Sequence, residues 1–176
     1  WGPGGEARSW GADGSRKALL GESGAEAAWV AADARRAAIA CGNRVEIRDL
    51  ATGALERALE HRAAVLATQW TPDGREIVAT GADGALRTWD ASTGTPRLDA
   101  DAGAGRPLQS LVLSPDGTRA AATQEKKLCT FLLSDGSRLT SVLYLANLQP
   151  CRFSPDWKRV LEVSWNHTQD FTTIDL

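Results

Sequence analysis

The sequence contains no methionine and only three cysteines among 176 residues. Cys41, Cys129 and Cys151 lie far apart, and each stands within an apolar segment. Structural zinc requires ligands paired at close spacing, such as two cysteines separated by two residues. We therefore expect free thiols and no metal. Because there is no initiator methionine, we also expect the chain to begin partway through a longer polypeptide.

Membrane and secretion signals are missing as well. No apolar run approaches the roughly 18 residues of a membrane helix, and residues 1–5 lack the basic and apolar stretches of a signal peptide. The formal net charge is −2, from 20 Lys and Arg against 22 Asp and Glu. This balance gives no electrostatic reason to expect nucleic acid as the main partner. We expect a cytoplasmic module that does not bind a membrane and for which nucleic acid is not the favoured partner.

Helical periodicity is also absent, since no segment shows an apolar period of 3.6 residues. The alanine-rich stretch 25–40 aligns with two strands of a neighbouring repeat, so we interpret it as strands. The glycine-rich turn at 81–84 lacks the Lys-Ser/Thr pair of a phosphate loop, and no helix follows it. These features predict an all-β chain without a cofactor.

The sequence does contain a repeat of about forty residues. A turn phrase, Ser/Thr-Pro-Asp in its best copies, recurs at intervals of 40, 43 and 40 residues. Its aspartates are Asp33, Asp73, Asp116 and Asp156. A second phrase, Leu-Arg-Thr-Trp-Asp at 86–90, keeps the same period at 45–49, 128–132 and 171–175. A fixed period of this length is typical of stacked supersecondary units.

Turn residues divide each repeat into four short strands. In the clearest copy these are expected at 65–71, 76–80, 85–90 and 96–99. Proline presets φ and glycine supplies positive φ, so the phrases between the strands have a physical reason to turn. Four antiparallel strands per repeat make one blade of a β-propeller.

On these two phrases the chain resembles the WD40-repeat family over nearly all of its length, most closely at 61–90. The resemblance implies an all-β propeller of about four blade-equivalents within a ring of seven or eight blades. Because an open half ring would leave sheet edges unpaired, we expect one segment of a larger propeller. Within this single domain, the expected repeat limits lie near 1–24, 25–60, 61–101, 102–143 and 144–176.

His61, Thr80 and Asp83 supply the three groups of a hydrolase triad, but we expect a structural role for them. In the blades that this repeat resembles, these groups and a strand tryptophan form a hydrogen-bonded tetrad, which here is His61, Thr80, Asp83 and Trp89. A half-buried turn leaves polar groups that must be paired, and an Asp–His bond would pair them. We therefore expect no catalytic residue.

Four residues stand just before the turn phrase and are expected in the core between blades: Val30, Trp70, Leu113 and Phe153. Trp157 replaces the turn glycine, and we expect it to be exposed, where it could anchor a partner. It could equally pack on a segment that this chain lacks.

The resemblance implies a non-catalytic scaffold or sensor module that binds a protein or peptide through its loop face. By loop position, the candidate partner-binding residues are Arg62, Arg106, Glu125, Lys126 and His167. The Ala-, Arg- and Gly-rich style resembles propellers that follow a STAND-type NTPase or a protein kinase in large bacterial proteins. Two alternatives stay open, an enzyme-type propeller and a nucleic-acid-binding propeller.

Overall fold

The computed structural model describes residues 7–10, 16–21, 25–102, 105–125, 127–143, 152–154, 156–164 and 170–175. Every regular element in these ranges is a β-strand. The first sheet pairs β1 (Ala7–Trp10) with β2 (Arg16–Gly21), and the second contains β3 (Ala25–Val30), β4 (Arg36–Cys41), β5 (Arg44–Asp49) and β6 (Leu55–Glu60). The third contains β7 (Val65–Trp70), β8 (Glu76–Gly81), β9 (Ala85–Asp90) and β10 (Pro96–Asp101). The fourth contains β11 (Gln109–Leu113), β12 (Arg119–Gln124), β13 (Lys127–Leu132) and β14 (Arg138–Leu143), and the fifth contains β15 (Arg152–Phe153), β16 (Arg159–Ser164) and β17 (Asp170–Asp175).

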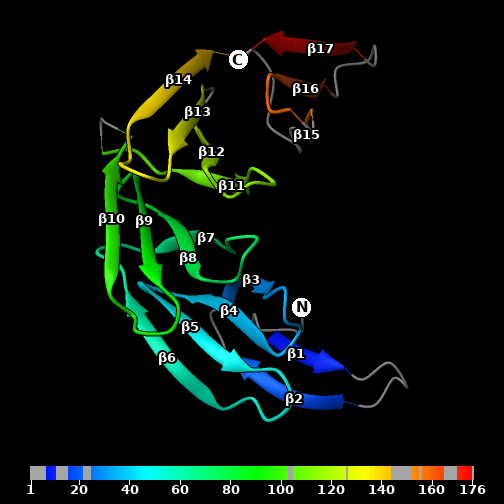
Figure 1. Ribbon diagram of the computed structural model, residues 1–176, viewed down its shortest axis with the longest axis vertical. Helices are drawn as coiled ribbons and strands as arrows, with labels where there is room; N and C mark the ends of the chain where they lie inside the picture. The colour runs from blue at the N-terminus through cyan, green and yellow to red at the C-terminus, as the bar shows by residue number, and fades with distance from the viewer. Residues whose placement is uncertain are drawn as a thin grey trace.

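The five sheets follow one another along an arc (Figure 1). All strand pairs are antiparallel, and within each sheet the strands lie in sequence order. The first strands β3, β7 and β11 contact one another in succession on the inner side of the arc, while β6, β10 and β14 lie on its outer side. The expected all-β architecture of four-stranded units is confirmed for the second, third and fourth sheets.

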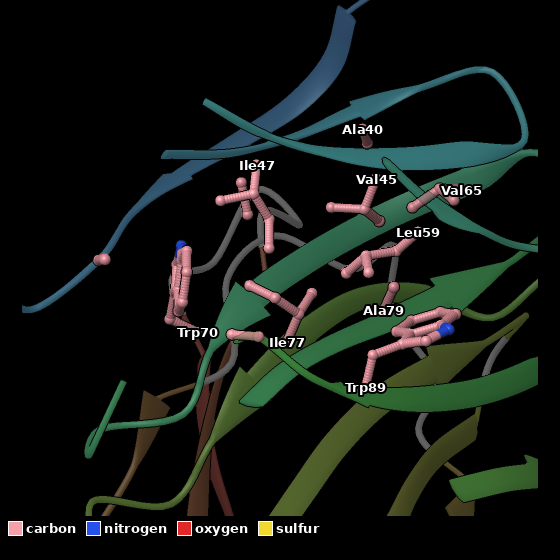
Figure 2. Packing of buried hydrophobic residues seen from close by; sticks show 12 residues of the cluster. Ala40, Val45, Ile47, Leu59, Val65, Trp70, Ile77, Ala79 and Trp89 are labelled. Carbon is pink, nitrogen blue, oxygen red and sulfur yellow. The ribbon is translucent and has the colours of Figure 1, made fainter. Parts of the chain in front are cut away.

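Both faces of the third sheet are buried, which explains the nearly continuous apolar runs of its strands. Side chains alternate between the faces of a strand. Ile77 and Ala79 of β8 therefore belong to the cluster shared with the second sheet, and Val78 to the cluster shared with the fourth. Figure 2 shows the first cluster, where Ile47 and Leu59 approach Trp70, Ile77 and Trp89. The core thus consists of layers between neighbouring sheets.

The turn phrase owes its repetition to a hydrogen-bonded unit. The Thr71 hydroxyl donates to Asp73 Oδ1 (2.7 Å), and its oxygen accepts the Glu76 N–H (2.9 Å). The serine–aspartate pairs of the next two turns repeat this arrangement. The Ser114 hydroxyl and the N–H and hydroxyl of Thr118 lower the pKa of Asp116 to about 2. The carboxylate and hydroxyl of each phrase therefore serve the turn itself.

The residue after each turn aspartate has a positive φ. The values are 53° at Ala34, 69° at Gly74, 71° at Gly117 and 55° at Trp157. Two of the four positions thus hold a side chain in a left-handed conformation, which non-glycine residues adopt at a cost. The sequence prediction of a turn is right at all four, although only two contain the glycine that the turn favours.

The expectation that Trp157 is exposed is wrong. Its side chain is buried, with an exposed fraction of 6%. The indole stacks on the ring of Phe153, with centroids 4.3 Å apart and an interplanar angle of 15°. Because stacking buries a large apolar area, it offsets the strain of the left-handed backbone. Trp157 therefore contributes to packing at this turn, and it is not a surface anchor for a partner.

The expectation of a core position is wrong at Val30. Trp70 and Leu113 pair with the second residue of the neighbouring strand and are exposed by only 3% and 8%. Val30 has the same register opposite Ala37 but is 52% exposed. Phe153 is half-buried. Among the described residues, the sheet that precedes Val30 has only two strands, β1 and β2, and these leave the face of β3 uncovered.

We predict that Ala34→Gly stabilises the protein by about 1 kcal/mol, because glycine adopts the left-handed conformation without a Cβ penalty. Equilibrium urea unfolding of the intact protein measures this. The matched control is Gly74→Ala, which places the penalty in the equivalent turn and should destabilise by a similar amount. Opposite signs for the two substitutions are required; a loss of stability in Ala34→Gly would contradict the prediction.

Candidate functional site

The loops between sheets and the turns between second and third strands meet at one end of the structure, which we call the loop face. The His61 N–H donates to Asn43 O (2.8 Å), and the Val65 N–H to Gly42 O (2.7 Å). One repeat later, the Ala102 N–H donates to Gly84 O (2.9 Å). These bonds join the loop between two sheets to the turn between the second and third strands of the preceding sheet.

His61 lies buried at the loop face. Nη1 of Arg87 is 3.0 Å from its Nδ1 and 2.9 Å from its Nε2. The Trp89 ring lies beside the imidazole at a tilted angle, with centroids 6.0 Å apart. Burial, followed by the charge of Arg87, lowers the pKa of His61 below its ordinary value. The imidazole is therefore neutral near pH 7, because a second cation cannot share this buried space with Arg87.

Arg87 is held by two carboxylates. Nη1 donates to Asp83 Oδ2 (2.8 Å), and Nε lies 3.0 Å from Asp99 Oδ1. The second oxygen of Asp99 lies 3.1 Å from Nη2 of the exposed Arg62. Burial opposes ionisation of Asp83, but hydrogen bonds from Arg87 and the Ala85 N–H keep its pKa below the ordinary value. Two cations and two anions thus form a balanced group, the charge cluster, consisting of Arg62, Asp83, Arg87 and Asp99.

The structure brings His61, Asp83 and Trp89 of the expected tetrad to one place but links them differently. Asp83 accepts a hydrogen bond from Arg87, which takes the place of the expected Asp–His bond. Thr80 Oγ1 is buried and has no hydrogen-bond partner. Gly81 lies against His61 and Asp83 so closely that a Cβ there would collide with both side chains. Arginine, absent from the expected set, is the residue that connects His61 to Asp83.

Sequence reasoning missed Arg87, although a signal for it was present. Arg87 is the third residue of β9, and the same position holds Glu46 in β5 and Cys129 in β13. An arginine inside a buried strand must find a carboxylate or expose its charge. Asp83, four residues earlier, and Asp99, on the paired strand, were the available anions.

A second ion pair joins the next loop to its turn. The guanidinium of Arg106 contacts the carboxylate of Glu125, and the Gln124 amide donates to Arg106 O (3.0 Å). Both charged side chains are exposed, at 56% and 54%. Exposed pairs add little to stability, typically about 0–1 kcal/mol. Of the candidate partner residues, Arg62, Arg106 and Glu125 lie on the loop face, and Lys126 and His167 lie outside the described residues.

The chemistry of the loop face is that of a polar surface with charges of both signs. Thr80, the hydroxyl expected beside His61, is buried and does not bond to the imidazole. In the described part of the chain, no three His, Cys, Asp or Glu side chains are placed to hold a metal ion. The same residues include no helix long and apolar enough to cross a membrane.

The fold and the loop face define the chain as an all-β protein built from successive antiparallel sheets of a common register. No family model matches it. The chain is similar to the intraflagellar transport protein 80 homologs of Mus musculus and Rattus norvegicus, each 30% identical over 123 residues. The matched region is 67% of this chain but 14% of each relative, so the chain corresponds to a small part of those proteins.

We predict that Thr80→Val leaves stability unchanged or raises it by about 1 kcal/mol, because it removes a buried hydroxyl that has no partner. A bonded tetrad would instead make this substitution costly, by about 1–3 kcal/mol.

The matched control is Thr68→Val, since the Thr68 hydroxyl is also buried but donates to Val78 O (3.2 Å). It should cost about 1 kcal/mol. Urea unfolding of both variants of the intact protein measures the difference, and an equal loss in the two would contradict the structure at Thr80.

Proposed function

We propose that the chain is a WD-repeat segment of a β-propeller that binds protein partners through its loop face and has no catalytic activity. The observation that supports this most is the exposed polar loop face, carried by sheets that pack on one another through buried apolar layers. Similarity to part of two proteins named for intraflagellar transport also supports an interaction role.

The partner surface that we propose is centred on Arg62, Arg106 and Glu125. Arg62 projects beside Asp99, and Arg106 beside Glu125, so the exposed charges alternate in sign. Alternating charges favour a polar protein surface or peptide, whereas nucleic acid requires a continuous basic surface. A nucleic-acid-binding or enzymatic propeller is the alternative. A sensor role beside an NTPase or kinase, and a cytoplasmic location, stay predictions from the sequence.

The exposed face of β3 is evidence for a propeller that contains more strands than the described sheets do. Trp70 and Leu113 are covered by the four-stranded sheet that precedes each of them, but Val30 follows a sheet of two described strands. Two further strands beside β1 would place an apolar layer over Val30, as in the later repeats. We therefore propose that this segment belongs to a larger closed propeller.

We predict that Val30→Asp destabilises the intact protein by about 1–3 kcal/mol, as expected for a carboxylate in an apolar layer. Thermal and urea unfolding measure the loss. The control is Val112→Asp on β11, also partly exposed, at 37%. If Val30 is open to water in the intact protein, the two substitutions should have similarly small effects, within about 0.5 kcal/mol.

We predict that the double substitution Arg62→Glu and Arg106→Glu reduces co-purification of protein partners by about tenfold or more, since like charges across an interface cost several kcal/mol. Affinity purification of the intact protein with quantitative mass spectrometry measures this.

The control for the partner surface is Arg75→Glu, an equally exposed arginine on the turn between β7 and β8 at the other end of the sheet. It should leave partner recovery unchanged. If both variants lose partners equally, the loop face is not the specific binding surface. If neither variant loses partners, Arg62 and Arg106 are not needed for binding.

A further inference from the structure

The charge cluster lies beside a titratable side chain, His61, at the place where the second and third sheets meet. The proposed function does not use this arrangement. The imidazole of His61 is buried, and its nearest charged atom is the guanidinium of Arg87 at 2.9 Å. From the elements packed around it, Arg87 comes from β9, Asp83 from the turn before β9, and Asp99 from β10. On its own segment the charged neighbours are Glu60 and Arg62.

The charges in this cluster already balance. Arg87 engages both carboxylates, at 2.8 Å and 3.0 Å, and Arg62 engages the second oxygen of Asp99. A proton on His61 would add a third cation beside Arg87, whose two carboxylates are already paired. Because a buried uncompensated charge is costly, protonation favours any conformation in which the imidazole leaves Arg87 and reaches water.

His61 occupies the place where the second sheet meets the third. Its own N–H donates to Asn43 O, in the turn between β4 and β5. The Val65 N–H, at the start of β7, donates to Gly42 O in the same turn. Movement of the loop at 61–64 would therefore strain the bond from the Val65 N–H to Gly42 O, which joins the third sheet to the second at the loop face.

We propose that His61 acts as an acid-sensitive latch, whose protonation releases the loop at 61–64 from Arg87 and loosens the joint between the second and third sheets. Folding keeps the imidazole neutral, so its pKa in the folded protein lies below the ordinary value of 6.5. The open form binds the proton more readily. The latch is thus fully closed above that ordinary pKa, and it weakens as the pH falls from there toward the folded pKa.

The expected size of the effect follows from this linkage. Over that interval the ratio of open to closed joint rises by up to about tenfold for each pH unit. The next joint is an internal control, because Ala102 holds the position that corresponds to His61, with the same bond from its N–H to the turn before the third strand. There the Ala102 and Leu108 N–H groups donate to Gly84 O and Gly81 O and should show no such dependence.

Amide hydrogen exchange of the intact protein, corrected for the intrinsic effect of pH on exchange, tests the latch between about pH 7.5 and about pH 5. The His61 and Val65 amides should lose protection on acidification by about tenfold or more relative to those of Ala102 and Leu108. His61→Gln should abolish the difference, while His167→Gln, which removes the only other histidine, should preserve it. Equal protection at both joints, or an unchanged response in His61→Gln, would overturn the latch.

A measurement that needs no substitution at His61 complements the exchange experiment. An NMR titration of the imidazole should give a pKa below 6.5 in the otherwise unaltered protein. In Arg87→Gln the two carboxylates lose their cation, so the His61 pKa should move upward. A His61 pKa at or above its ordinary value, or one that Arg87→Gln leaves unchanged, would also overturn the proposal.

Discussion

Burial of both faces of the third sheet is the constraint on which the rest of the structure depends. A sheet with water on one face can alternate apolar and polar residues, but the third sheet faces apolar layers on both sides. Its second strand, Glu76–Gly81, is accordingly apolar at consecutive positions. The one charged side chain buried within its strands, Arg87, lies between the carboxylates of Asp83 and Asp99.

The third residue of each third strand shows how this constraint is met when a charge enters the layer. In β5 it is Glu46, which is buried between Arg44 (2.6 Å) and Arg48 (2.7 Å) on the same strand. In β9 it is Arg87, held by carboxylates from a turn and a neighbouring strand. In β13 it is Cys129, buried without charge. One position in a repeated fold thus accommodates an anion, a cation or a neutral group, provided that every charge has its counter-ion nearby.

The repeat could be read from the sequence because its markers are local. Ser114, Asp116 and Gly117 lie within one turn and fix its hydrogen bonds and positive φ by themselves, so the phrase is visible without knowledge of the fold. The strands of the third sheet were likewise expected to within two residues of their observed ends, since turn residues bound each of them. The packing of Trp157 was not predictable in this way, because its burial depends on Phe153 and on a strained φ that the sequence does not display.

The expectation from the sequence differs most from the structure at His61, and the cause is the neighbouring Arg87. Resemblance to a family supplies the residues that a blade normally pairs, His61 with Asp83, but it says nothing of a cation introduced between them. Arg87 is a strand residue, and only the register that places it opposite Ala79 and Asp99 brings its guanidinium to the imidazole. Once there, it satisfies Asp83 more strongly than a neutral histidine can, because the bond is between full charges. The arginine therefore makes His61 the neighbour of a cation as well as of a carboxylate, and its charge adds to burial in lowering the pKa of the imidazole.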